Sequence, residues 1–459
     1  MTEKEIVDYL KNNSIQKIKI AITDIDGVLR GKYIHTDKFL ESIDKGIGFC
    51  DVIFGWDCAD VCYDNVAVTG WHTGYPDKLA KMDLSTFRLI PWENNTPLIL
   101  GNFKHTDSTD LSICPRTLLE KVSKQAKDIG FETSFAQEFE WYNFIETPQS
   151  LSEKKYQHLT PLTPGMFGYS LLRTSSEDAY YTDLFDLLCA FGIPIEGLHT
   201  ETGPGVCEAA YLHDSILHAA DKAALLKTAV KQIAYKHGII ATFMAKINEN
   251  LPGSGGHIHQ SLWNADKTKN VFFDASDEHN MSETMKQYLA GQIHCLPHIL
   301  PMLAPTINSY KRLVEGAWAP TTLTWGVDNR TTALRVISQS PQSTRIEQRI
   351  SGADTNPYLA MAASLASGLY GIKHKLKLNV EPTVGNGYIN TSADRLAANL
   401  MDATQIMKTS KIAEELFKTI DSVVRQTKIA LVYIVEVETC LSKEIIYSYE
   451  ARPATKAEM

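Results

Sequence analysis

The stretch that decides the fold reads Gly253-Ser254-Gly255-Gly256-His257-Ile258-His259-Gln260-Ser261-Leu262. Its glycine-rich beginning gives a backbone that can approach a bound ligand closely. The residues that follow alternate with a period of two, so a strand places His257, His259 and Ser261 on one face. Two imidazoles and a hydroxyl on one face indicate either the floor of a polar site or a hairpin whose solvated face carries histidines.

The composition is that of a globular chain, with 459 residues of which 44% are hydrophobic and 22% charged. This length predicts two domains, or one large domain with an appendage. A net charge of −9 argues against a nucleic-acid partner. No apolar run reaches membrane-spanning length, and the N-terminus lacks the apolar core of a signal peptide. Eight cysteines without regular spacing fit reduced thiols. We therefore expect a cytoplasmic protein that binds neither nucleic acid nor membrane.

Hydrophobic periodicity divides the chain at the polar run 105–110, which predicts domains at 1–105 and 106–459. The first part is predicted to hold a helix at 3–12 and a small sheet with strands at 15–22, 28–34 and 98–103. The second part is predicted to hold strands at 133–144 and 239–246 and helices at 115–129, 180–191, 215–237, 274–303, 357–374 and 396–439. The chain shows no regular βαβ alternation, no dinucleotide-binding glycine fingerprint and no Walker loop.

Acidic residues recur at spacings that bring carboxylates together. Glu138 and Glu140 are two apart in a predicted strand, so both project to one face, where they repel unless a cation or a proton lies between them. Glu201 and Glu208 flank a Gly-Pro-Gly turn that folds them toward each other. With His257 and Glu347, these residues suffice for more than one divalent ion, and a thiol-free oxygen-rich set suits Mg²⁺ or Mn²⁺. The alternative is a group of ordinary solvated acids.

Several basic residues follow in one short, otherwise apolar region. Arginine forks recognise carboxylates and phosphates through two parallel hydrogen bonds. Arginines that face a divalent-metal carboxylate site are typical of a phosphoryl-transfer pocket, because charge is then balanced from both sides. The alternative is a set of surface ion pairs. The arginines in question are Arg312, Arg330, Arg335, Arg345 and Arg349.

Taken together, these motifs resemble the glutamine synthetase family over nearly the whole chain. The matching stretches are Asp24 to Lys32, Ser254 to Leu262, Asn308 to Leu313 and Asn356 to Ala360. The resemblance implies an α+β fold, with a small β-grasp-like N-terminal domain and a large catalytic domain. It also implies a homo-oligomer of stacked rings, usually a dodecamer of two hexamers, in which neighbouring N- and C-terminal domains share each active site.

The resemblance also implies roles for individual residues. One metal ion near the acceptor carboxylate would be held by Glu140, Glu201 and Glu208. A second metal ion, near the ATP phosphates, would be held by Glu138, His257 and Glu347. Arg312 and Arg349 would bind glutamate carboxylates, with Gly253, Glu140 and Glu201 beside the substrate. ATP would lie against His259, Ser261, Arg335, Arg345 and Lys246, and Arg330 would stabilise the transferring phosphate.

The departures from the family pattern bear on the acceptor. Members that use ammonia carry a glutamate in a loop where this chain has Trp318, and an Asp-Gly-Ser-Ser stretch where this chain has Phe54-Gly55-Trp56-Asp57-Cys58-Ala59-Asp60. Both changes remove carboxylates that bind ammonium and accept its proton, whereas a tryptophan suits an alkyl or aryl amine. Pro252 replaces an asparagine of the glutamate site, which leaves the acyl donor open.

Three functions follow from these observations. The first is an ATP-dependent ligase that joins L-glutamate to an organic amine through γ-glutamyl phosphate, with Trp318, Arg330 and Arg349 in the catalytic site. The second is a glutamine synthetase that uses ammonia, with Asp57 or Asp60 as the base. The third is a non-catalytic structural relative, against which stands the presence of every metal and arginine position of the family.

Overall fold

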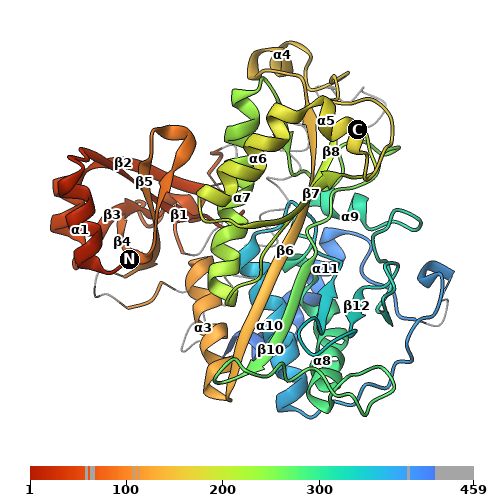
Figure 1. The fold of residues 1–459 in the computed structure, drawn as a ribbon. Helices are drawn as coiled ribbons and strands as arrows, with labels where there is room; N and C mark the ends of the chain where they lie inside the picture. Colours follow the sequence, from red (N-terminus) through yellow and green to blue (C-terminus); the bar gives the residue numbers. More distant parts are fainter. Residues whose placement is uncertain are drawn as a thin grey trace.

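The computed structural model describes residues 1–56, 60–62, 68–105, 107, 109–111, 113–389 and 393–418. These residues form a five-stranded sheet and an eight-stranded sheet, with helices packed against both. Figure 1 shows the first sheet, in red and orange, to one side of the larger sheet, with α7 and α3 between them. This mixed architecture confirms the predicted α+β class. The predicted domain boundary at residue 105 remains a prediction.

The N-terminal sheet has the strand order β2-β1-β5-β4-β3. Strand β1 runs antiparallel to β2 and parallel to β5. The alternation predicted from the sequence determines its faces, since Ile18, Ile20 and Ile22 are almost fully buried whereas Lys17 is exposed. The elements of this part are α1 (Glu3–Asn12), β1 (Lys17–Thr23), β2 (Leu29–His35), α2 (Thr36–Ser42), β3 (Ile47–Cys50), β4 (Asp77–Ile90) and β5 (Thr96–Lys104).

The larger sheet has the order β11-β12-β13-β10-β6-β8-β7, with β9 also paired to β6. Its strands are β6 (Phe131–Phe144), β7 (Ile195–Thr200), β8 (Val206–Tyr211), β9 (Ile240–Thr242), β10 (Ile258–Asn264), β11 (Trp325–Val327), β12 (Leu334–Ile337) and β13 (Arg345–Gln348). The helices are α3 (Pro115–Asp128), α4 (Pro148–Glu153), α5 (Leu171–Ser176), α6 (Asp178–Ala190), α7 (Ile216–Lys236), α8 (Glu283–Ile299), α9 (Ile307–Arg312), α10 (Pro357–Lys373), α11 (Leu400–Thr409) and α12 (Lys411–Lys418).

One face of this larger sheet packs against helices. Phe135, Phe139 and Ile258 are buried there in the main hydrophobic cluster. A polar residue on the same face, Gln260, is also buried, and its side-chain carbonyl accepts hydrogen bonds from the Tyr288 hydroxyl and the Gln292 amide of α8, both at 2.7 Å. Because strand residues alternate between faces, the neighbouring histidines and glutamates project to the opposite face, away from these helices.

A buried arginine joins the two sheets. Arg116 on α3 donates to Asp221 of α7 through Nε at 2.8 Å and Nη2 at 2.9 Å. Its Nη1 donates to Asn102 of β5 at 2.7 Å, and its Nη2 donates to Asp83 of β4 at 2.7 Å. The side chains of Arg116 and Asp221 are only 2% and 1% exposed. The charge of this arginine is therefore balanced by carboxylates from both parts of the chain.

A second connection links sequence motifs that lie more than 330 residues apart. The Asn356 side-chain amide donates to the carbonyls of Asp24 and Ile25 at 3.2 and 2.8 Å. Its oxygen accepts from the backbone of Tyr358 at 3.0 Å and so caps the start of α10. Gly27 lies against this residue with φ +80°, and a Cβ there would come within 3.0 Å of the Asn356 Cα. The N-terminal turn is thus positioned by a helix cap.

Two predicted elements differ from the structure. The strand predicted at 239–246 is only Ile240–Thr242, because the backbone of Lys246 pairs instead with the Asn308 side chain. The helix predicted at 274–303 begins only at Glu283, because Asp274 and Asp277 accept hydrogen bonds from the amides of Ser276 and His279 and form turns. The helix predicted at 396–439 corresponds to α11 and α12 up to residue 418, and its remainder lies outside the described residues.

The described part of the chain contains no helix that combines the length and the apolar character needed to span a membrane.

Removal of the buried arginine is expected to destabilise the whole chain. Arg116→Leu should lower the free energy of unfolding by about 3–5 kcal/mol, because Asp221 would keep a buried charge without its partner. Urea denaturation followed by circular dichroism measures this change. Lys124→Met, which removes the exposed pair of Lys124 with Asp128, serves as the control and should cost less than about 1 kcal/mol. Equal effects of the two substitutions would contradict the assigned role of Arg116.

Candidate active site

The face of the larger sheet opposite Phe135, Phe139 and Ile258 carries acids and histidines that the strand register aligns. Glu140 of β6 lies opposite Glu208 of β8, which in turn lies opposite His199 of β7. Further along the sheet, His259 of β10 lies opposite Glu347 of β13. Directly opposed residues share a face, so these side chains form a row across the strands. Main-chain hydrogen bonding therefore fixes the positions of groups that come from distant parts of the sequence.

The first cluster consists of Glu138, His259 and Glu347, each of which offers one ligand atom within 4.8 Å of the others. His257 also belongs to this region, because its Nδ1 lies 2.8 Å from Glu138 Oε1 and 3.5 Å from Glu347 Oε1. His259 Nε2 lies 3.4 Å from Glu138 Oε2. His257, His259 and Glu347 are thus all brought close to Glu138.

Arginines determine which nitrogen of each histidine faces Glu138. Arg312 Nη2 lies 3.3 Å from His257 Nε2, and Arg345 Nε lies 3.1 Å from His259 Nδ1. Guanidinium groups only donate, so in the neutral histidines these nitrogens accept and the other nitrogen of each ring carries the proton. Burial and the charge of Arg349 lower the pKa of His257 to about 4, which keeps this ring neutral. Both rings therefore present an N–H group to Glu138.

Glu347 is fully buried and held between two arginines. Arg335 Nη1 donates to its Oε2 at 2.9 Å, and Arg349 Nη1 donates to its Oε1. Burial favours the protonated acid and is the largest single effect, but Arg349 and other neighbouring groups together outweigh it and lower the pKa of Glu347 to about 2. This carboxylate is therefore ionised and fixed in orientation, as a metal ligand requires.

The second cluster consists of His199, Glu201 and Glu208. His199 Nδ1 lies 3.8 Å from Glu201 Oε2, and His199 Nε2 lies 4.0 Å from Glu208 Oε1. The ring of Tyr169 stacks on the histidine, with centroids 4.4 Å apart. His199 is not among the site residues predicted from the sequence. The available signal was its position two residues before Glu201 in an extended segment, which puts both side chains on one face.

The acids of the second cluster and their neighbour are poorly compensated in the ligand-free chain. Burial, together with the charges of Glu138 and Glu140, raises the pKa of Glu208 to about 10. Burial also raises the pKa of Glu140 to about 7, although the Gly255 amide donates to it at 2.6 Å. These carboxylates thus lack the positive charge that would stabilise their ionised forms. A thiol-free set of carboxylates and imidazoles fits a divalent cation such as Mg²⁺ or Mn²⁺, which would supply that charge.

The glycine-rich loop packs against the same site. A Cβ on Gly253 would lie 2.7 Å from Arg312 Cγ and 2.8 Å from the Ala245 carbonyl, so a side chain does not fit there. The preceding residue, Pro252, accepts a hydrogen bond from the Tyr142 hydroxyl at 2.8 Å. Lys246 is buried beside the loop, and burial and Arg312 lower its pKa. Close packing explains why this segment is rich in glycine.

The remaining predicted residues lie around the two clusters. Arg312 is buried and donates to the carbonyls of Ile350 and Arg349 at 2.9 and 3.1 Å. The Ser261 hydroxyl accepts from Trp263 Nε1 at 3.1 Å. Arg330 is exposed, and its backbone carbonyl accepts from Arg349 Nε at 3.0 Å.

The loop around Trp318 borders the site at Arg349. Arg349 Nη2 donates to the Trp318 carbonyl at 3.4 Å, and the tryptophan has a left-handed backbone with φ 57° and is 61% exposed. The same arginine bonds Glu347, so one guanidinium connects this loop to the first cluster. Asp57, the other residue predicted to act on the acceptor, lies outside the described residues.

The chain is similar to several known proteins. The family model described as "Glutamine synthetase, catalytic domain" matches residues 112–425. The chain is 52% identical to type-1 glutamine synthetase 2 of Dictyostelium discoideum over 417 residues, which cover 90% of this chain and 80% of that protein. It is 38% identical to a glutamate–isopropylamine ligase of a Pseudomonas species, with 90% of each chain covered. The solved structure "GmaS/ADP complex-Conformation 1" superposes with a TM-score of 0.82 at 24% identity, covers 100% of this chain and 98% of its own, and shows the fold alone.

Loss of one acid in the first cluster is expected to weaken binding of a divalent ion. Glu138→Gln should lower the affinity for Mn²⁺ at least about tenfold, because it removes a charged ligand atom from the centre of the cluster. Electron paramagnetic resonance of free Mn²⁺ measures this binding without activity. Glu132→Gln, a change six residues away on the same face of β6, is the matched control and should bind Mn²⁺ as the unmodified chain does. Unchanged Mn²⁺ affinity in Glu138→Gln would exclude the cluster as a metal site.

Proposed function

The chain belongs to the glutamine synthetase family, and on this premise we propose that it joins L-glutamate to an organic amine. Membership makes it an ATP-dependent ligase. The proposed reaction has two steps. An oxygen of the γ-carboxylate attacks the γ-phosphorus of ATP, and ADP leaves. The amine nitrogen then attacks the acyl carbon of γ-glutamyl phosphate, the carbon–oxygen bond to phosphate breaks, and the amine loses a proton as the amide forms.

The two clusters would hold the divalent ions. In the proposed arrangement, Glu138, His257 and Glu347 bind one ion, with His259 alongside. Glu140, Glu201 and Glu208 bind another, with His199 as an additional ligand. Bound Mg²⁺ or Mn²⁺ would neutralise the charge that moves between phosphate and carboxylate.

The arginines would place the negative groups of both substrates. Arg349 and Arg312 are assigned to the glutamate carboxylates, close to the glycine loop at Gly253. Arg335 and Arg345 are assigned to the ATP phosphates, together with Lys246, His259 and Ser261. Arg330 is assigned to the transferring phosphoryl group. Arg330 is exposed, and its positive charge opposes the rise that burial causes in the pKa of Tyr169. Both observations support a position of Arg330 over the space between the two clusters.

The observation that carries the choice of an organic amine is Trp318. Trp318 is exposed at the edge of the site, and its backbone carbonyl accepts a hydrogen bond from Arg349. Tryptophan has no base that could deprotonate ammonium, but it offers a large face to methylenes or to an alkylammonium group. The one carboxylate in the same loop, Glu315, pairs with Arg395 at 2.6 Å. That pairing argues against Glu315 as a substitute base.

Asp60, the other candidate base, also forms an ion pair. Asp60 Oδ1 accepts from Arg30 Nη1 at 2.9 Å, and the same arginine donates to Asp24 through Nε at 2.8 Å. This carboxylate is therefore already held by an arginine, which argues against Asp60 as the base. The name of the glutamate–isopropylamine relative is consistent with an amine acceptor.

The second candidate is a glutamine synthetase that uses ammonia. It is favoured by the relative with that name at 52% identity, which exceeds the identity to the amine ligase. In this case Asp57 would have to serve as the base.

Kinetics with a panel of acceptors distinguish the two candidates. With glutamate and Mg-ATP saturating, kcat/KM should be higher for n-butylamine than for ammonia by about two orders of magnitude, since each buried methylene adds roughly 0.8 kcal/mol. Coupled detection of ADP measures each rate. Ammonia as the best substrate would identify the chain as a glutamine synthetase.

A reciprocal substitution tests the part played by Trp318. Trp318→Glu should raise kcat/KM for ammonia and lower it for n-butylamine, because a carboxylate binds ammonium and accepts its proton. Trp71→Glu, at an exposed tryptophan of the N-terminal part, is the control and should leave the ratio of the two unchanged. A ratio that Trp318→Glu does not alter would remove Trp318 from the acceptor site.

The proposal includes a ring oligomer of two stacked hexamers. The motivation is the family resemblance over the whole chain, including the N-terminal part that completes a neighbour's site in the family. Mass photometry at micromolar concentration should give a particle of about twelve times the chain mass of 51.2 kDa. A monomer alone under these conditions would contradict the shared active site.

A further inference from the structure

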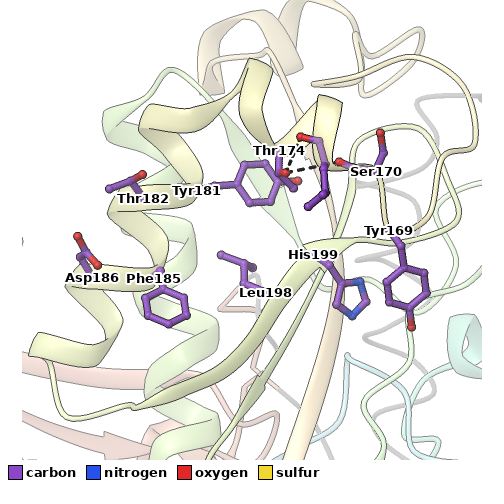
Figure 2. Close-up of a pocket in the computed structure, with 10 residues that line it drawn as sticks. Tyr169, Ser170, Thr174, Tyr181, Thr182, Phe185, Asp186, Leu198 and His199 are labelled. Carbon is purple, nitrogen blue, oxygen red and sulfur yellow. Dashed lines mark hydrogen bonds between the residues drawn. The ribbon is translucent and has the colours of Figure 1, made fainter.

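A pocket of about 420 Å³ lies beside β7, the last strand of the larger sheet. It is lined by residues of the segment 169–174, of helix α6 and of β7, which Figure 2 draws as sticks. One lining residue is His199, which also belongs to the second candidate metal cluster. The pocket therefore adjoins the site and has a volume in the range of small-molecule binding pockets.

The walls of this pocket are largely apolar. Leu198 lies between α6 and His199 in Figure 2, and the ring of Phe185 lies beside it. Tyr169, stacked on His199, forms the wall next to the cluster. Leu171 is 82% exposed and also lines the pocket. Such a surface suits an alkyl chain, which would cover apolar area that is now in contact with solvent.

The end of the pocket remote from His199 carries a carboxylate. Figure 2 shows Asp186 and His199 on opposite sides of the group, with Leu198 between them. Of the three acids of α6, Asp183 pairs with His237 at 2.8 Å and Asp178 accepts from Thr182 at 3.4 Å. Within the described ranges, Asp186 has neither a hydrogen bond nor an ion pair.

We propose that this pocket receives the carbon chain of the acceptor amine and that Asp186 binds a second ammonium group at its far end, which makes linear diamines the preferred acceptors. This inference rests on the proposed amine ligase function. The reacting nitrogen lies on the His199 side as the free amine, attacks the acyl carbon and loses its proton. The distal nitrogen remains protonated throughout and forms a charge-assisted hydrogen bond with the aspartate.

The test compares two acceptors with the same four-carbon chain, putrescine and n-butylamine, which differ in the distal ammonium group. The quantity measured is the ratio of their kcat/KM values. The unmodified enzyme should favour putrescine, and Asp186→Asn should lower the ratio about tenfold or more, in line with hydrogen bonds between charged groups. Asp183→Asn, on the same helix and outside the pocket, is the matched control and should leave the ratio as it is. An unaltered ratio in Asp186→Asn would overturn the inference.

A second variant tests occupation of the pocket independently of charge. Thr182→Trp places a large side chain in the lining and should lower kcat/KM for both four-carbon amines relative to methylamine. If the variant uses all three amines in unchanged proportion, the carbon chain lies elsewhere and the inference fails. If the unmodified enzyme uses ammonia in preference to every amine, the proposed function itself fails. The two failures are therefore distinguishable in one set of assays.

Discussion

The site depends on one electrostatic constraint, which is that several carboxylates share one face of a sheet. Main-chain pairing across β6, β8, β10 and β13 leaves these groups no freedom to separate. Where arginines face them, as at Glu347, the carboxylate is ionised and fixed. Where no cation faces them, as at Glu208, the proton is retained because a second buried charge would be too costly. The site therefore has two parts. Arginines neutralise the carboxylate of Glu347 in one part, whereas Glu208 in the other part has no such partner among the described residues.

The opposite face of the sheet makes this arrangement possible. Helices cover it, and Gln260 anchors β10 to α8 through buried hydrogen bonds. Because these hydrogen bonds hold β10 on its helix-covered face, His259 is held in a fixed position on the opposite face. At β7 the sheet ends, and α5 and α6 continue the surface in place of another strand. The pocket near His199 lies at this edge, between β7, α6 and the segment 169–174.

Local periodicity accounts for what the sequence predicted correctly. A period of two predicts that Glu138 shares a strand face with Glu140, and that His257 shares one with His259. The pairing of β6 with β10 then brings these two faces side by side. The proximity of His259 to Glu347 depends on pairing between strands more than eighty residues apart, which no local pattern contains. His199 was missed although a period of two also pairs it with Glu201, and only its proximity to Glu208 depends on the pairing of β7 with β8. The early end of β9 likewise reflects competition from Asn308, a tertiary contact.

The cap at Asn356 has a consequence for how this chain can vary. A single side chain starts α10 and also holds the turn that contains Asp24 and Ile25, and Gly27 must stay small and left-handed beneath it. A substitution in the turn at Asp24 to Gly27 therefore affects the helix cap at Asn356, and the reverse also holds. In homologous chains, the residues at these two places should therefore covary. A chimera that takes its N-terminal hundred residues from a relative will assemble well only if the donor turn and the recipient helix cap match.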